Sequence, residues 1–394
     1  MTSLSSIGIA LVSSGVFAFQ PFGLGGNTQS ISSFKYVRSE LPNFTLSKQN
    51  ATLHRKLCYA KFQKGDYKSA LKDCNKAIKI DQGSYYAFYL RGVIREELDD
   101  LKGAMDDFKR SVNLNAKYAY TFSRIGDTKI KLNDLNGAVE AYTKAIKIDP
   151  DYTYAFQERA ETYIKLKEYK KAIRDFDNAI SLAPEYEYLY VIRGDSKLKI
   201  GDKQGAIEDY EKAIQLDPEY AYAYVSLGDA KIDLNDLNGA IEAYTKAIQI
   251  DPKDAYPYQE RGDTYYNLKD YEAAIRDFTK VIQMNPGIDF MAYAYSMRAR
   301  SNARLNNYDL AISDSTKSIN LKPGISYAYI IRAAIMLQIE DYNSALDDLN
   351  EAILLDPSIS YYYKLRGDIK IELNDTEGAI LDYNKAVELN NDKD

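Results

Sequence analysis

Apolar and small residues recur along the chain at spacings typical of paired helices. In residues 221–254, positions 4, 8 and 11 lie on one face of a first helix, and positions 20, 24, 27 and 28 lie on one face of a second. Asn235 and Asp236, which favour turns, stand between them. Pro252 follows the second helix, because proline cannot donate a hydrogen bond inside a helix. The pattern predicts a hairpin of two antiparallel helices.

This 34-residue pattern fills most of the chain. Position 20 is Ala in all ten copies, position 8 is small in each, and position 32 is Pro in seven consecutive copies, from Pro150 to Pro357. Small residues let two helix backbones approach closely, and aromatic side chains such as Tyr224 and Tyr244 fill the remaining space. One hairpin cannot bury its own apolar face, so we expect the hairpins to stack. The ten copies start at residues 51, 85, 119, 153, 187, 221, 255, 292, 326 and 360.

One junction differs from the others. Copies seven and eight are 37 residues apart, because three extra residues lie within 287–291. This insertion predicts a slightly longer loop. The alternative is a hinge between the first seven copies and the last three.

The repeat resembles the tetratricopeptide repeat (TPR) family over residues 51–394. The resemblance implies an all-α fold, a right-handed superhelical solenoid of ten tandem TPR helix hairpins. It also implies that the first helix of each hairpin (helix A) lines a concave groove, and that the second (helix B) forms much of the outer surface.

Position 7 is usually apolar in this family, but here it is Arg in seven copies, and in those copies position 23 is Asp. Where position 7 is Ile125 or Leu227, position 23 is Ala. Copy one is the exception, with Leu57 and Asp73. We infer an ion pair between the two helices of each hairpin, and a partner-binding role for the Arg residues is the alternative. The pairs are Arg91–Asp107, Arg159–Asp175, Arg193–Asp209, Arg261–Asp277, Arg298–Asp314, Arg332–Asp348 and Arg366–Asp382.

The resemblance places positions 2 and 9 on the concave face. Tyr offers a rigid, amphipathic contact, and carboxylates favour a partner that carries Lys or Arg. The alternative is structural: the Tyr side chains pad the seam between repeats, and the acids pair with a Lys such as Lys129 or Lys197. The candidate groove residues are Tyr120, Tyr154, Tyr188, Tyr222 and Tyr256 at position 2, and Asp127, Glu161, Asp195, Asp229 and Asp263 at position 9.

Two kinds of partner are not expected. The net charge of −6 and the pI near 5.2 argue against nucleic acid, whose binders usually carry a basic stripe. Some TPR proteins bind an Hsp70/Hsp90-type acidic tail through Lys, Asn and Arg at concave positions, and this set is missing. Copy one has Arg55 at position 5 but Tyr59 at position 9. Basic concave residues gather instead in copy eight, at Arg300 and Arg304.

The composition also limits the chemistry. One His and two Cys are too few for the usual metal sites, and the sequence has neither a Gly-rich phosphate loop nor a His-based triad. We therefore expect no enzyme, no metal and no cofactor. Cys58 and Cys74 take positions 8 and 24 of copy one, which face each other. A disulfide is expected in an oxidising compartment, and two buried thiols in a reducing one.

The N-terminal segment, residues 1–50, precedes the repeats. Residues 7–19 form an apolar run of 13 residues, too short to span a bilayer but typical of a signal peptide. We interpret residues 1–18 as a signal peptide without the usual basic start, followed by a linker. Export or membrane association is then expected, and a cytoplasmic protein is the alternative.

These features predict a protein- or peptide-binding scaffold that uses the concave groove, as in assembly of a larger complex. The alternatives are a self-assembling structural spacer and a non-catalytic regulatory arm of an enzyme complex. Ile380, Tyr383 and Val387 of copy ten are expected to be partly uncovered, which favours self-association through this end.

Overall fold

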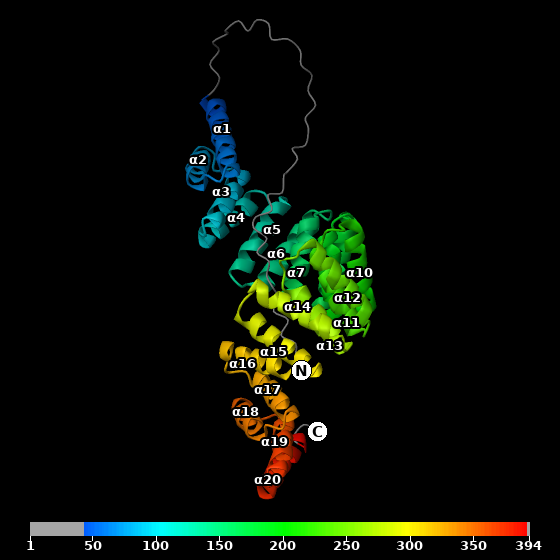
Figure 1. Cartoon of the computed structure of the whole chain (residues 1–394). Helices are drawn as coiled ribbons and strands as arrows, with labels where there is room; N and C mark the ends of the chain where they lie inside the picture. Colours follow the sequence, from blue (N-terminus) through cyan, green and yellow to red (C-terminus); the bar gives the residue numbers. More distant parts are fainter. Residues whose placement is uncertain (1–42, 392–394) are drawn as a thin grey trace.

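The computed structural model describes residues 43–391, which form ten helix hairpins stacked in chain order (Figure 1). These residues contain α-helices and no β-strand. The helices, in pairs, are α1 Asn43–Gln63 and α2 Tyr67–Ile80; α3 Tyr85–Glu97 and α4 Leu101–Leu114; α5 Ala119–Lys131 and α6 Leu135–Ile148; α7 Thr153–Lys165 and α8 Tyr169–Leu182; α9 Glu187–Lys199 and α10 Lys203–Leu216; α11 Ala221–Asp233 and α12 Leu237–Ile250; α13 Tyr256–Asn267 and α14 Tyr271–Met284; α15 Ile288–Arg304 and α16 Tyr308–Leu321; α17 Ser326–Gln338 and α18 Tyr342–Leu355; α19 Ser360–Glu372 and α20 Thr376–Asn391.

The predicted all-α solenoid is confirmed, and two boundaries differ from expectation. Helix α1 begins at Asn43, so residues 43–50, which we expected in the linker, belong to the first helix. The three extra residues between copies seven and eight do not lengthen a loop. They are helical and give α15 about one more turn at its N-terminal end, after Gly287 at φ 134°.

The turn inside each hairpin has the same backbone geometry. Position 15 has a positive φ in every copy, as at Asn235 (φ 61°), which reverses the chain after helix A. Position 16 then caps helix B in most copies, where Asp236 accepts a hydrogen bond from the backbone N–H of Gly239 at 3.0 Å. The turn expected at Asn235 and Asp236 is therefore a left-handed residue followed by a helix cap.

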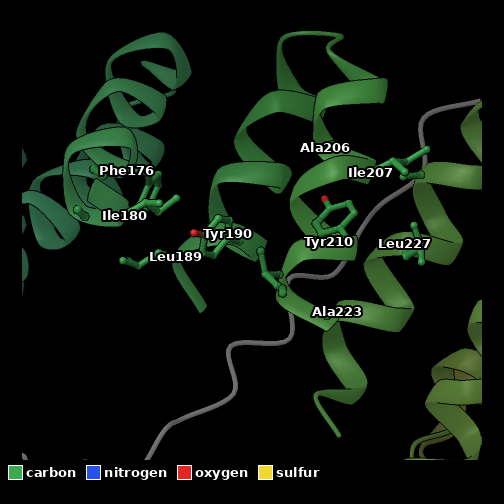
Figure 2. Close-up of a cluster of buried hydrophobic side chains, with 14 of the residues drawn as sticks. Phe176, Ile180, Leu189, Tyr190, Ala206, Ile207, Tyr210, Ala223 and Leu227 are labelled. Atoms are coloured by element: carbon green, nitrogen blue, oxygen red, sulfur yellow. The ribbon is translucent and has the colours of Figure 1, made fainter. Parts of the chain in front are cut away.

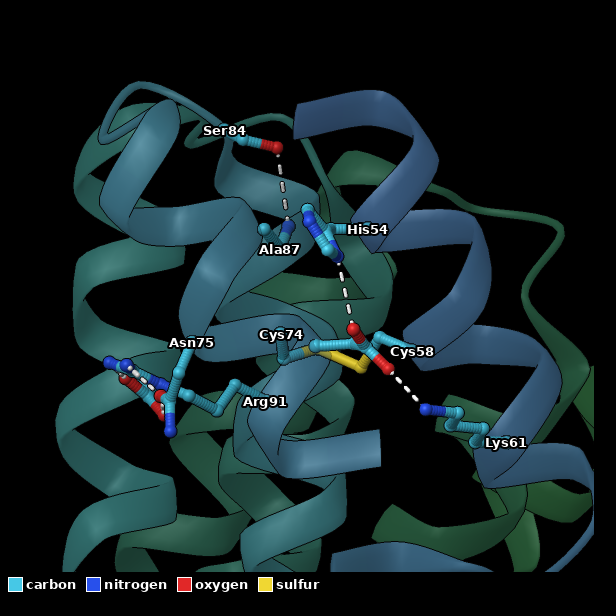
Figure 3. Close-up of a disulfide and its surroundings, with 10 residues drawn as sticks. His54, Cys58, Lys61, Cys74, Asn75, Ser84, Ala87 and Arg91 are labelled. Atoms are coloured by element: carbon cyan, nitrogen blue, oxygen red, sulfur yellow. Dashed lines mark hydrogen bonds and ion pairs between the residues drawn. A yellow bond between two sulfur atoms is a disulfide. The ribbon is translucent and has the colours of Figure 1, made fainter. Parts of the chain in front are cut away.

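Close packing of the two helices depends on a small residue facing an aromatic ring. A Cβ atom added to Gly228 would lie 2.5 Å from the ring of Tyr244, so this position needs glycine. In copy one the same two positions hold Cys58 and Cys74, which form a disulfide between α1 and α2 (Figure 3). The disulfide thus joins the helices where the other hairpins rely on packing.

The buried core consists of clusters that extend across the seams between neighbouring hairpins. One cluster runs from Phe176 in copy four through Tyr210 in copy five to Leu227 in copy six (Figure 2). Burial of each apolar face therefore depends on its neighbour, as expected for a solenoid.

All seven inferred Arg–Asp pairs are ion pairs in the structure. Arg261 donates from Nε and an Nη atom to the two oxygens of Asp277, at 2.8 and 2.7 Å. Its other Nη atom donates to Thr245 Oγ1, on helix B of the preceding repeat, at 2.8 Å. A side chain of the preceding helix B accepts from each of the other six Arg residues in the same way, at Asn75, Thr143, Asp177, Thr279, Thr316 and Asn350.

The exception in copy one has a local explanation. Asp73 has no Arg at position 7, but it accepts from His54 Nδ1 at 3.0 Å and from Lys61 Nζ at 2.6 Å (Figure 3). Burial opposes ionisation of Asp73, but the hydrogen bonds from Lys61 and His54 lower its pKa overall.

Removing one partner of a buried pair should be costly, whereas removing both should not. Arg261→Ala leaves Asp277, 5% exposed, without its cation, and should lower the free energy of unfolding by about 3 kcal/mol in urea titrations followed by circular dichroism. Arg261→Leu with Asp277→Ala copies Leu227 and Ala243 of copy six and should recover most of this loss. Equal losses for the single and double variants would contradict the assignment.

Candidate binding groove

Position 9 of one repeat and Tyr at position 2 of the next form a hydrogen bond across each seam of the central solenoid. Tyr256 OH, for example, donates to Asp229 at 3.2 Å, and Tyr293 OH to Asp263 at 2.8 Å. We call this series the seam ladder. Its acidic rungs are Asp127–Tyr154, Glu161–Tyr188, Asp195–Tyr222, Asp229–Tyr256 and Asp263–Tyr293.

A second tyrosine reaches several of these acids from helix B of the same repeat. Tyr142, Tyr210 and Tyr244 at position 24 donate to Asp127, Asp195 and Asp229, each at 2.7 Å. This contact was not predicted from the sequence. Its signal is that position 9 is Asp in every copy whose position 24 is Tyr, although Asp263 of copy seven goes with Phe278.

The alternative pairing of the position-9 acids with Lys129 or Lys197 is wrong. Lys129 pairs with Asp134 at 2.9 Å and Lys197 with Asp209 at 2.9 Å, both toward helix B of their own repeat. The alternative role of the position-2 tyrosines is present in the structure, because they bridge the seams. Tyr120 differs from the other tyrosines, because the residue at position 9 of the preceding copy is Val93 rather than an acid. The ring of Tyr120 packs between the rings of Tyr118 and Tyr152.

Copies three to five have cations near their groove acids, which offset part of the effect of burial, although burial still raises the pKa of Glu158 to about 8. Lys131, Lys165 and Lys199 at position 13 favour the ionised forms of Asp127, Glu158 and Asp195, respectively. Copy three adds Arg124, which lies 3.4 Å from Asp127. In copies six and seven, position 13 is Asp233 and Asn267, so no cation takes this place.

The groove acids of copies six and seven, which have no cation at position 13, form what we call the acid cluster, Asp229, Glu260 and Asp263. Glu260, at position 6 of copy seven, is a groove residue that the sequence analysis did not single out. Its signal is the run Gln-Glu-Arg, which copies four and seven share and which also supplies Glu158. Within residues 43–391, no Lys or Arg forms an ion pair with any of the three acids of the cluster. One buried oxygen of Asp263, Oδ1, accepts no hydrogen bond from these residues.

Burial controls the ionisation of the acid cluster. The three side chains are half-buried in the groove wall, and burial raises the pKa of Asp229 to about 6, of Asp263 to about 7 and of Glu260 to about 8. Neighbouring acids add to the effect: Asp263 raises the pKa of Glu260, and Asp195 raises that of Asp229. At neutral pH the cluster is therefore partly protonated and would be stabilised by an added cation.

The next rung reverses the charge. Arg300 takes position 9 of copy eight and donates to Tyr327 OH, at position 2 of copy nine, at 3.1 Å. Its guanidinium lies 4.8 Å from the ring centre of Tyr266, whose hydroxyl accepts from Arg304 Nε at 3.3 Å. The basic residues expected in copy eight thus adjoin the acid cluster.

The remaining predicted features lie outside the groove or outside the described residues. Val387 and Ile380 of copy ten are 58% and 53% exposed, whereas Ile180 and Ile207, at the same repeat positions, are 9% and 8% exposed. Self-association through this face stays a prediction. The predicted signal peptide, with the apolar run 7–19, lies outside residues 43–391, so export or membrane association stays a prediction. No described helix is long and apolar enough to cross a bilayer. Among those residues, no group of three or more His, Cys, Asp or Glu side chains is arranged to hold a metal ion.

Family models described as "TPR repeat" match residues 126–167, 194–231 and 228–269, and others described as "Tetratricopeptide repeat" match 53–83, 153–186, 255–287 and 360–393. The chain belongs to the tetratricopeptide repeat family. A model of "Anaphase-promoting complex subunit 5" matches residues 290–356, within TPR copies eight and nine. Comparison with curated proteins finds no match.

Solved structures share this TPR fold. The C-terminal part of a TPR repeat-containing protein from Cytophaga hutchinsonii is 24% identical with a TM-score of 0.53, over 61% of this chain and 98% of that one. A MamA protein is 30% identical with a TM-score of 0.41, over 42% of this chain and 91% of that one. YrrB, "a TPR protein with an unusual peptide-binding site", is 21% identical with a TM-score of 0.41, over 48% and 96%. The TPR repeats indicate that this protein is, in general terms, a protein-interaction scaffold.

The acid cluster should make the stability of the TPR solenoid depend on pH. The pKa values of these acids in the folded protein lie above the ordinary values of 3.8 and 4.5. Their contribution to the free energy of unfolding is therefore largest below about pH 4 and is lost as the pH rises to about 8. Glu260→Gln with Asp263→Asn should therefore raise the free energy of unfolding by about 1–2 kcal/mol at pH 8.5 and change it little at pH 4.5. Urea titrations at the two pH values measure this.

The matched control is Glu208→Gln with Glu242→Gln, which removes two exposed acids from the helices α10 and α12. A gain that is the same at both pH values, or the same in the control, would contradict the assignment of raised pKa values to the acid cluster.

Proposed function

We propose that the protein binds an extended peptide or protein segment in its concave groove, and that the acid cluster receives a Lys or Arg side chain of that segment. The observation that carries the proposal is the lack of an ion-pair partner for Asp229, Glu260 and Asp263 within residues 43–391. The buried acids at position 23, in contrast, each have Arg or another cation beside them. The half-buried Glu158 and Asp195 also form no ion pair within residues 43–391, but Lys165 and Lys199 lie near them.

The surroundings of the acid cluster suit a cationic side chain. Tyr256 and Tyr293 donate to Asp229 and Asp263 and so hold these carboxylates in place. Tyr222 is 48% exposed beside them, on the adjacent rung, and offers an aromatic face to a cation or to the peptide backbone. A bound ammonium or guanidinium group would favour the ionised acids and offset part of the cost of their burial.

A partner with accessible basic residues is therefore expected, in line with the net charge of −6. Ten stacked hairpins also leave a long outer surface beside the groove, which supports a role in assembly of a larger complex. The alternatives are a structural spacer and a regulatory arm. Neither role requires groove acids that lack an ion-pair partner, so this feature favours binding.

Neutralising the acid cluster tests the proposal. The probe is a 12-residue acetylated peptide of alternating Lys and Ala, and its affinity for the protein is measured by isothermal titration calorimetry. Asp229→Asn, Glu260→Gln and Asp263→Asn together should weaken binding at least about tenfold while preserving the fold, because each change keeps a hydrogen-bond acceptor.

The control combines Glu208→Gln, Glu242→Gln and Glu272→Gln, three exposed acids of the helices α10, α12 and α14. It removes the same number of carboxyl groups away from the groove, and at pH 7 it removes at least as much negative charge, because the acid cluster is partly protonated. If both triple variants bind the peptide equally, attraction by overall charge explains binding and the proposed site is wrong.

A further inference from the structure

The seam ladder changes sign at one rung without changing its geometry. Asp263 and Arg300 both stand at position 9, and each is hydrogen-bonded to Tyr at position 2 of the following repeat, at 2.8 and 3.1 Å. Because they occupy equivalent places in adjacent repeats, the acidic part of the groove passes directly into a basic part. Arg300 is close enough to favour the ionised form of Asp263.

Arg300 and Arg304 are held in place but are not neutralised. Tyr266 contacts both, with its ring beneath the guanidinium of Arg300 and its hydroxyl accepting from Arg304. Both Arg side chains are exposed, and within residues 43–391 neither forms an ion pair with a carboxylate. The seven Arg residues at position 7 differ, because each gives two donors to Asp. Because both side chains are exposed, a planar carboxylate can reach the N–H groups of Arg300 and Arg304, which fit it well.

We infer that the groove binds a dipolar peptide segment in one direction, with a Lys or Arg on the acid cluster and an Asp or Glu carboxylate on Arg300 and Arg304. This inference rests on the proposed function and adds the second charge and the orientation. A uniformly basic segment would meet repulsion at copy eight, and a uniformly acidic segment would meet repulsion at copies six and seven. The reversal thus selects a charge pattern rather than a net charge.

Four acetylated and amidated 12-residue peptides test this inference with the full chain. One has a Lys-Ala block followed by a Glu-Ala block, the second has the same blocks in the opposite order, the third replaces Glu by Ala, and the fourth replaces Lys by Ala. Titration calorimetry should show that one of the two dipolar peptides binds at least about tenfold more tightly than the other three.

Arg300→Ala with Arg304→Ala should remove that preference. The preferred dipolar peptide should lose about tenfold in affinity. The peptide without Glu should bind the variant as tightly as the wild type or more tightly, because the two Arg residues no longer repel its Lys residues. The control, Arg174→Ala with Arg276→Ala, removes two exposed Arg residues of the helices α8 and α14 and should have no such effect. Circular dichroism checks that each variant is folded.

The two failures can be told apart. If the peptide without Glu binds as tightly as either dipolar peptide, and the double Arg variant leaves all affinities unchanged, the dipolar inference is wrong while the proposed function stands. Equal binding of the two dipolar peptides overturns the fixed direction. If none of the three Lys-bearing peptides binds, the proposed function fails, and the dipolar inference fails with it.

Discussion

A half-buried guanidinium at position 7 links three helices in seven of the ten repeats. Arg193, for example, extends from α9, binds Asp209 on α10, and reaches back to Asp177 on α8, the last helix of the preceding repeat. Geometry of this kind fixes the hairpin angle and the position of the next hairpin together, because a planar fork of donors fits only one arrangement of acceptors. Copies three and six, which have apolar side chains there, depend on packing and on their neighbours' ion pairs.

The concave side carries a second network across the same seams, and there the chemistry can vary. A phenol hydroxyl can donate to a carboxylate or accept from a guanidinium, so Tyr at position 2 accommodates either charge at position 9. Asp229 with Tyr256 and Arg300 with Tyr327 are the two cases. The tyrosine therefore preserves the seam, while its partner at position 9 determines the local charge beside it.

The sequence alone predicted the features that recur at constant spacing within one repeat. Arg261 and Asp277 are 16 residues apart, and the absence of both in copies three and six identifies the pair. Contacts across a seam, such as Tyr256 with Asp229 over 27 residues, could not be predicted in the same way, because they depend on how neighbouring hairpins stack. Glu260 was missed since only copies four and seven have Glu at position 6. The additional turn of α15 was missed because an insertion beside proline and glycine favours a loop.

The account as a whole requires that a bound cation change the ionisation of the acid cluster. The most direct measurement is titration calorimetry of the wild-type protein with the Lys-Ala peptide at pH 7, in two buffers that differ in ionisation enthalpy. The difference in heat counts the protons exchanged on binding. With pKa values of about 6, 7 and 8 in the free groove, binding should release up to about 1.5 protons at pH 7 and almost none at pH 9.5. Binding with no proton exchange at pH 7 would contradict the account.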